Sequence, residues 1–149
     1  MSKDKKIQKI VVSAFIHKDG KLLIARRADK ESFLPGVYEL PGGNIEFGET
    51  TEEGLAREIK EELHIDVKIG EPFYVFTTID SETQHTIEID YFATLIDHNQ
   101  DIQLNPEDHS EFRWVSQDDF LNFFKDNKSG GESAKKGFVI LSKKNDYIR

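Results

Sequence analysis

Three glutamates, Glu58, Glu61 and Glu62, are spaced so that a helix would place their carboxylates on one face. Like charges at this spacing destabilise a solvated helix by roughly a few tenths of a kcal/mol each. A divalent cation bound among them would turn that cost into a gain, and oxygen-only ligands suit Mg²⁺, Mn²⁺ or Ca²⁺. The alternative is an ordinary solvated acidic face that Arg57 and Lys60 partly balance.

The segment 51–63 is predicted to be the helix that carries these glutamates. Thr50 has the position of an N-cap, and Glu53 follows at the spacing of a capping box. The apolar face of the helix consists of Leu55, Ala56, Ile59 and Leu63. His64 stands where a left-handed glycine normally ends a helix. We expect His64 to take that backbone conformation, and the alternative is that its imidazole donates to a ligand.

The sequence 43–65 resembles the box of the Nudix family. That box reads Gly, five residues, Glu, seven residues, Arg-Glu, an aliphatic residue, any residue, Glu-Glu, any residue, Gly and an aliphatic residue. The matching positions here are Gly43, Glu49, Arg57, Glu58, Ile59, Glu61, Glu62 and Ile65. The one departure is His64 in place of glycine. A looser similarity covers most of residues 7–125, including the hairpin that ends in Arg26–Arg27 and the later segment FRWVS.

This resemblance implies an α/β/α sandwich, the Nudix fold, with a central mixed β-sheet. It implies hydrolysis, with Mg²⁺ or Mn²⁺ as cofactor, of a nucleoside diphosphate linked to another moiety. We expect a nucleoside triphosphate pyrophosphohydrolase of the MutT type. The alternatives are another Nudix substrate, such as a nucleotide sugar or a dinucleotide, and a non-catalytic nucleotide-binding module of the same fold. The residues alone also allow an acidic cation-binding domain that does not use nucleotides.

The resemblance also implies roles for the residues of the box. The expected metal ligands are three carboxylates and one backbone carbonyl: Glu58, Glu61, Glu62 and Gly42. Glu49 and Arg57 would orient these carboxylates by ion pairing and hydrogen bonding. The chemistry agrees, because cations that neutralise phosphate oxygens and activate a water are what pyrophosphate hydrolysis requires.

A carboxylate is expected to take the proton of the attacking water. Glu61 or Glu62 could do so. The polar loop 105–111 could instead supply the base, with Glu107 and Asp108 as its nearest candidates and His109 and Glu111 as weaker ones. The alternative for this loop is an ordinary solvated surface.

Two further pairs of residues are candidates for contact with the substrate or for the surface of the sheet. Arg26 and Arg27 end a predicted strand, and arginine forks suit phosphate oxygens. The position of Arg27 resembles that of the phosphate-side arginine of MutT-like proteins, and adjacent strand residues face opposite ways, so at most one should reach a phosphate. Glu88 and Asp90 share a strand face, which we expect to be the solvated side of the sheet.

The order of predicted elements favours a mixed sheet with helices packed on it, in one domain over residues 1–149. Strands are expected at 10–16, 22–25, 36–40, within 67–79 with a break near 70–72, at 85–96 and at 112–116. Beyond the glutamate helix, further helices are expected at 116–125 and 134–143. Residues 1–6 and 127–133, the latter containing KSGGES, are expected to be flexible.

Composition restricts the class of partner. The chain has 149 residues, a net charge of −8 and scattered basic residues, so we expect no nucleic-acid partner, which would normally require a basic stripe. No apolar run is long enough to span a membrane, and the N-terminus lacks the apolar stretch of a signal peptide. There is no cysteine. We therefore expect a cytoplasmic monomer or homodimer that acts on a small-molecule nucleotide.

Overall fold

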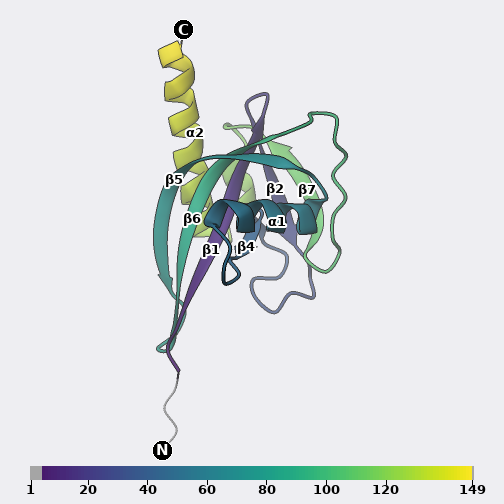
Figure 1. The fold of residues 1–149 in the computed structure, drawn as a ribbon. Helices are drawn as coiled ribbons and strands as arrows, with labels where there is room; N and C mark the ends of the chain where they lie inside the picture. Colours follow the sequence, from purple (N-terminus) through teal and green to yellow (C-terminus); the bar gives the residue numbers. More distant parts are fainter. Residues whose placement is uncertain (1–4, 149) are drawn as a thin grey trace, which may run out of the picture.

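A mixed β-sheet with helices on both faces forms the centre of this computed structural model, in which residues 5–148 are described (Figure 1). The strands are β1 Ile7–Lys18, β2 Lys21–Arg27, β3 Tyr38–Glu39, β4 Gly42–Asn44, β5 Val67–Ile79, β6 Gln84–Leu95 and β7 His109–Val115. The helices are α1 Thr51–Leu63, the 3₁₀ helix η1 Phe120–Phe123 and α2 Lys128–Ile148. The strand order is β3-β2-β1-β6-β5, with β4 paired to β1 and β7 paired to β2. Only β1 and β6 pair in parallel among the described strands, so the predicted α/β/α arrangement around a mixed sheet is confirmed.

β1 sends alternate side chains to two separate cores. On one side, its buried residues Val12, Ala14 and Ile16 pack with Leu55, Ile59 and Leu63 of α1, which crosses that face in Figure 1. On the other side, Phe15 packs with η1 and α2, and its ring meets that of Phe138 edge to face at 5.1 Å between centroids. This alternation is the period of an extended strand, and it fixes both helices to one sheet.

Local signals set both ends of α1. The Thr50 hydroxyl accepts the N–H of Glu53 at 3.1 Å, and the Glu53 carboxylate accepts the N–H of Thr50 at 3.4 Å, so the predicted capping box is confirmed. His64 has φ of 59° and ψ of 34°, and its N–H donates to the carbonyl of Lys60. The predicted left-handed C-cap is therefore confirmed. The His64 imidazole Nδ1 donates to the Gln103 carbonyl at 2.5 Å, and this contact holds the loop beyond β6 against the helix end.

The prediction of a flexible segment at 127–133 is wrong, because helix α2 begins at Lys128. Asn127 caps that helix: its Oδ1 accepts the N–H of Gly130 at 3.0 Å, and its Nδ2 donates to the carbonyl of Tyr38 at 2.9 Å. Further along α2, a Cβ placed on Gly137 would lie 2.5 Å from the Phe15 ring. Glycine in this region therefore serves close packing of the helix on the sheet.

The prediction of an α-helix at 116–125 is also wrong, because the structure has a short 3₁₀ helix there. Ser116 donates through Oγ to Asp119 Oδ2 at 3.0 Å and forms a turn, after which only the short η1 follows. The face of β6 that carries Glu88 and Asp90 is not solvated as expected. Asp90 is fully buried, because α2 and η1 cover this face of the sheet together with Phe92.

Several strand limits differ from the expected ones. The strand expected at 36–40 is reduced to β3, and Gly42 and Gly43 after it belong to a further short strand, β4. β5 is continuous, although its pairing with β6 shifts register between Ile69 and Tyr74, close to the expected break. These irregularities leave the central pairing of β1 with β6 intact over ten residue pairs.

The described part begins two residues before β1 and ends with α2. The flexibility expected for residues 1–6 concerns residues 1–4, which lie outside the described part, and Lys5 and Lys6, which are exposed and precede β1. Within residues 5–148, no helix combines the length and the apolar character needed to cross a membrane.

The C-cap of α1 gives a stability prediction. We expect His64→Gly to be more stable than His64→Ala by about 1 kcal/mol, because both lose the imidazole contact but only alanine keeps a Cβ in the left-handed conformation. Urea unfolding of the two variants beside the parent chain measures this difference. Equal stabilities of the two variants would show that the backbone at this position carries no strain.

Candidate active site

A cavity of about 430 Å³ brings together residues that are distant in the sequence. Its walls come from β1, β4, β5, β6, α1, the loop after β2, the start of β7 and the start of α2. Among the residues predicted for the site, Gly42, Glu58, Glu62, Asp108 and Arg27 line it. The others that were predicted, namely Glu49, Arg57, Glu61, Glu107 and Arg26, do not belong to the lining.

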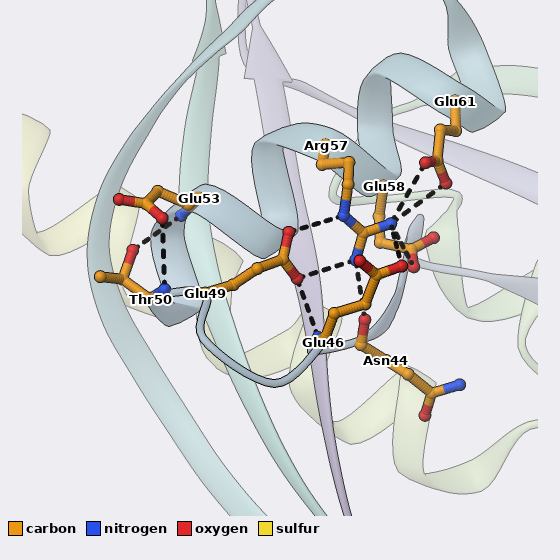
Figure 2. A network of polar contacts seen from close by, with 8 residues as sticks. All are labelled: Asn44, Glu46, Glu49, Thr50, Glu53, Arg57, Glu58 and Glu61. Carbon is orange, nitrogen blue, oxygen red and sulfur yellow. Dashed lines mark hydrogen bonds and ion pairs between the residues drawn. The ribbon is translucent and has the colours of Figure 1, made fainter.

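Arg57 is the centre of a network of ion pairs beside the cavity (Figure 2). Its Nε and Nη2 donate to the two carboxylate oxygens of Glu49 at 2.6 and 2.9 Å, a bidentate geometry. Its Nη1 donates to Glu58 and to Glu61 at 3.2 Å, and its Nη2 also donates to the carbonyl of Asn44 at 3.1 Å. These contacts fix the position of the Glu58 carboxylate, and the contact with Asn44 joins the guanidinium to β4.

The same network lowers the pKa of Glu49. Hydrogen bonds from the Arg57 guanidinium, and next from the backbone N–H of Glu46, lower the pKa of Glu49 from 4.5 to about 2. In turn the carboxylate of Glu49 raises the pKa of Arg57. Glu49 is thus ionised and permanently paired at neutral pH, which is the state needed to hold the arginine in place.

The pKa values of Glu62 and Glu58 are raised, whereas that of Glu49 is lowered. Glu62 is buried, and burial, with the nearby charges of Glu39, Glu58 and Asp108, raises its pKa well above the ordinary value. Burial also raises the pKa of Glu58, against the opposing effect of Arg57. These carboxylates sit in surroundings that disfavour their charge, and their own neighbours carry more negative charge.

Two glycines before α1 allow this close approach. The N–H of Gly42 donates to Glu62 Oε2 at 3.2 Å. A Cβ on Gly43 would lie 2.4 Å from the carboxyl carbon of Glu58, so any other residue there would displace that carboxylate. The backbone N–H of Gly42 therefore faces Glu62, and ligation by its carbonyl stays a prediction.

The remaining carboxylates separate into two groups. Glu61 turns toward Arg57 with both oxygens at 3.2 Å, and its side chain is 55% exposed. Glu107 pairs with Lys30 at 2.8 Å on the surface. Asp108 instead lines the cavity, where burial, and to a smaller extent Glu31, Glu61 and Glu107, raise its pKa. Of the two nearest loop candidates, only Asp108 faces the cavity.

The two arginines at the end of β2 have different surroundings, as expected from strand alternation. Arg27 lines the cavity and donates to Glu39 at 3.1 Å and to Glu31 at 3.2 Å. Arg26 donates to Ser110 Oγ at 2.9 Å and pairs with Asp29 at 3.1 Å. Of these two arginines, Arg27 is therefore the one that can meet a ligand in the cavity.

The sequence analysis missed Glu39 and gave little weight to His109. The structure brings one oxygen or nitrogen each of Glu39, Glu62 and His109 within 4.8 Å of one another. His109 is fully buried, and its Nε2 donates to Glu39 Oε2 at 2.9 Å. The available signal was the position of Glu39 at the end of a short strand, directly before the Leu-Pro-Gly-Gly turn.

The donors at this end of the cavity fit a divalent cation. Glu58, Glu62, Glu39 and Asp108 supply carboxylate oxygens, which suit hard cations. Burial, and next the charges of Glu39, Glu58 and Asp108, raise the pKa of Glu62 and so disfavour its ionised form. A bound cation would remove that penalty, because it favours the ionised form of each ligand.

Comparisons with known proteins agree with this geometry. The model of a family described as NUDIX domain matches residues 7–136. A nucleoside triphosphatase, NudI, from Escherichia coli O81 (strain ED1a) is 29% identical over 124 residues, which cover 78% of this chain and 87% of that protein. A MutT NUDIX hydrolase from Burkholderia pseudomallei is 27% identical with a TM-score of 0.68, covering 76% of this chain and 86% of that one. A MutT protein from Methanosarcina mazei Go1 is 26% identical with a TM-score of 0.70, covering 91% and 99%.

The paired state of Glu49 predicts a pH dependence of stability. A carboxylate whose pKa is lowered on folding stabilises the fold above pH 4.5, and this contribution disappears as the pH falls toward about 2. We expect Glu49→Gln to melt below the parent chain at pH 7 and the two melting temperatures to converge as the pH approaches about 2. Thermal unfolding across this range measures the effect. Glu71→Gln, which changes an exposed carboxylate of β5, is the control. A difference that stays constant with pH would contradict the pairing.

The buried Glu62 predicts a gain in stability on its removal. A carboxylate whose pKa is raised on folding stabilises the fold only below its unfolded pKa, and the contribution is lost as the pH rises through the folded value. At pH 8 with a chelator present, we expect Glu62→Gln to melt about 2–4 °C above the parent, the shift that about 1 kcal/mol gives at this size. Added Mg²⁺ should raise the melting temperature of the parent and should have less effect on Glu62→Gln. A chelator-treated variant that melts below the parent would contradict the charge imbalance.

Proposed function

The chain belongs to the NUDIX domain family and is a MutT-like Nudix hydrolase, and from this premise we propose that it hydrolyses nucleoside triphosphates with Mg²⁺ to a nucleoside monophosphate and pyrophosphate. The observation that carries this proposal is the convergence of Glu58, Glu62 and Asp108 on one end of a cavity large enough for a nucleotide. The similar protein NudI is named as a nucleoside triphosphatase, which supports the substrate class.

Glu58 and Glu62 are the side chains we propose as metal ligands, with Glu61 and the Gly42 carbonyl as the further ligands that the Nudix box implies. Glu39 lies close enough to Glu62 to share in the site. When bound, Mg²⁺ or Mn²⁺ supplies charge neutralisation at the phosphate oxygens and a lowered pKa for a bound water. Arg57, held by Glu49, keeps Glu58 directed at this end of the cavity.

Asp108 is the residue of the 105–111 loop that we propose as the acceptor of the proton from the attacking water. It lines the cavity with Glu58 and Glu62, whereas Glu107 is engaged with Lys30 on the surface. Glu61 and Glu62 remain the alternatives within α1. A base must lie within reach of the proton that it takes, so its place in the cavity decides among the loop residues.

Arg27 is the side chain we propose for contact with a substrate phosphate. It lines the cavity, and its guanidinium is already oriented by the Glu31 and Glu39 carboxylates. A phosphate would compete with these two carboxylates for the same N–H donors. The cost of that exchange is smaller if Glu39 turns to a cation beside Glu62 at the same time.

A substrate screen with two variants tests this function. We expect the parent chain with Mg²⁺ to release pyrophosphate from at least one nucleoside triphosphate, and Glu58→Gln and Glu62→Gln to lower kcat by about 100-fold or more, because each removes charge at the reacting phosphates. Separate assays of pyrophosphate and of phosphate identify the bond that breaks, and circular dichroism checks folding.

The control for this screen is Glu71→Gln, which changes a carboxylate on exposed β5 and should leave kcat unchanged. Release of phosphate alone would mean that the terminal anhydride bond is cleaved. Activity confined to nucleotide sugars or dinucleotides would move the chain to another Nudix substrate. Unchanged turnover in both active-site variants would contradict the assigned roles of Glu58 and Glu62.

A further inference from the structure

From the carboxylates of α1, the lining of the cavity extends across four paired strands, β4, β1, β6 and β5. Strand register places Asn44 of β4 beside Val11 of β1, Val11 beside Glu88 of β6, and Glu88 beside Phe76 of β5. All four side chains line the cavity. Neighbouring strands lie about 4.8 Å apart, so Glu88 is about 10 Å across the sheet from the turn that holds the α1 carboxylates.

The surroundings of Glu88 suit a flat, largely apolar group with a polar edge. Val11 and Phe76 flank it on the sheet, and Phe33 and Leu34 contribute apolar wall from the loop after β2. Glu88 places a carboxyl group among them. Small-molecule sites commonly combine such apolar walls with a few polar groups that select the ligand.

A second carboxyl group sits directly behind Glu88. Asp90 lies two residues further along β6, on the same strand face, and is fully buried. Its Oδ2 accepts a hydrogen bond from Ser133 of α2. Within the described residues its Oδ1 has no ordinary donor. The carboxyl groups of Glu88 and Asp90 lie close enough for each to influence the protonation of the other.

A hydrogen bond between two carboxyl groups needs one proton between them. Burial, followed by the interaction with Asp90, raises the pKa of Glu88, so this pair of carboxyl groups retains a proton. Burial also raises the pKa of Asp90, while its hydrogen bonds to Glu88 and Ser133 lower it. A proton shared by the pair holds the two carboxyl groups together, and Glu88, which lines the cavity, can present an oxygen there as an acceptor.

We propose that Glu88 selects the base of the bound nucleotide, accepting a hydrogen bond from an N–H group on the edge of the base while Asp90 holds the Glu88 carboxyl in its acceptor orientation. This inference rests on the proposed function for the identity of the ligand as a nucleotide. Asp90 is a positioning residue, because it acts through Glu88. A pair that shares one proton also carries less negative charge than two free carboxylates, which reduces repulsion of phosphates bound toward α1.

Three substitutions at Glu88 separate this role from a purely structural one. Glu88→Gln keeps the arrangement, because its amide can donate to Asp90 and present a carbonyl oxygen to the cavity. Glu88→Met removes the acceptor at similar volume. Glu88→Thr is a second loss variant in case methionine folds poorly, since its hydroxyl remains available to Asp90. Glu82→Gln, on the exposed turn before β6, is the matched control.

The experiment measures binding of AMP, GMP, CMP and UMP to each variant by calorimetry, because monophosphates retain the base and cannot be hydrolysed at an anhydride bond. We expect the parent chain to prefer some bases over others, and Glu88→Gln and Glu82→Gln to keep that preference. Glu88→Met and Glu88→Thr should reduce the preference by about three- to tenfold, the size of one neutral hydrogen bond. Thermal unfolding confirms that each variant is folded.

Several outcomes overturn this inference. They are equal binding of all four bases by the parent chain, a preference that survives in both loss variants, and a preference that disappears in Glu88→Gln. A uniform loss of affinity for all four bases would assign Glu88 to structure alone. The proposed function fails separately: if no nucleoside triphosphate is hydrolysed but the base preference depends on Glu88, the inference stands without it.

Discussion

The bidentate ion pair between Arg57 and Glu49 is the interaction on which the rest of the site depends. One guanidinium meets four carboxylates, those of Glu46, Glu49, Glu58 and Glu61. Glu49 binds it most closely and fixes its plane. One positive charge cannot balance four negative ones, so Arg57 orients the acidic face of α1 without neutralising it. The remaining negative field favours a divalent cation, and in the function proposed such a cation would let this acidic face meet a polyphosphate.

β1 links this acidic face to the rest of the cavity. It pairs with β4, which carries the glycines beside Glu58 and Glu62, and in parallel with β6, which carries Glu88 and Asp90. Its alternate side chains fasten α1 to one face of the sheet and α2 to the other. A shift of register by one residue would exchange those faces, so the two buried cores also fix the distance between the two acidic groups.

The sequence predicts α1 well because its signals are local. Thr50 and Glu53 cap it, its apolar residues have helical spacing, and His64 takes the place of a capping glycine. Residues that meet through the pairing of distant strands were harder to predict. Glu39 and His109 meet only because β2 pairs with both β3 and β7. Alternation in β6 showed that it has two faces, but it could not show that α2 covers the face with Asp90.

The beginning of α2 shows why that cover was missed. Glycine and serine at 128–133 are typical of a linker, but Asn127 caps a helix there through contacts with Gly130 and with Tyr38 of β3. The helix then places Ser133 on Asp90. Negative charge in and beside this cavity is therefore compensated in different ways: by the Arg57 guanidinium at Glu49 and, in the proposals made above, by a proton shared by Glu88 and Asp90 and a metal ion at Glu58 and Glu62. In those proposals, separate compensation would let one end of the cavity remain charged for phosphate chemistry while the other stays close to neutral for a base.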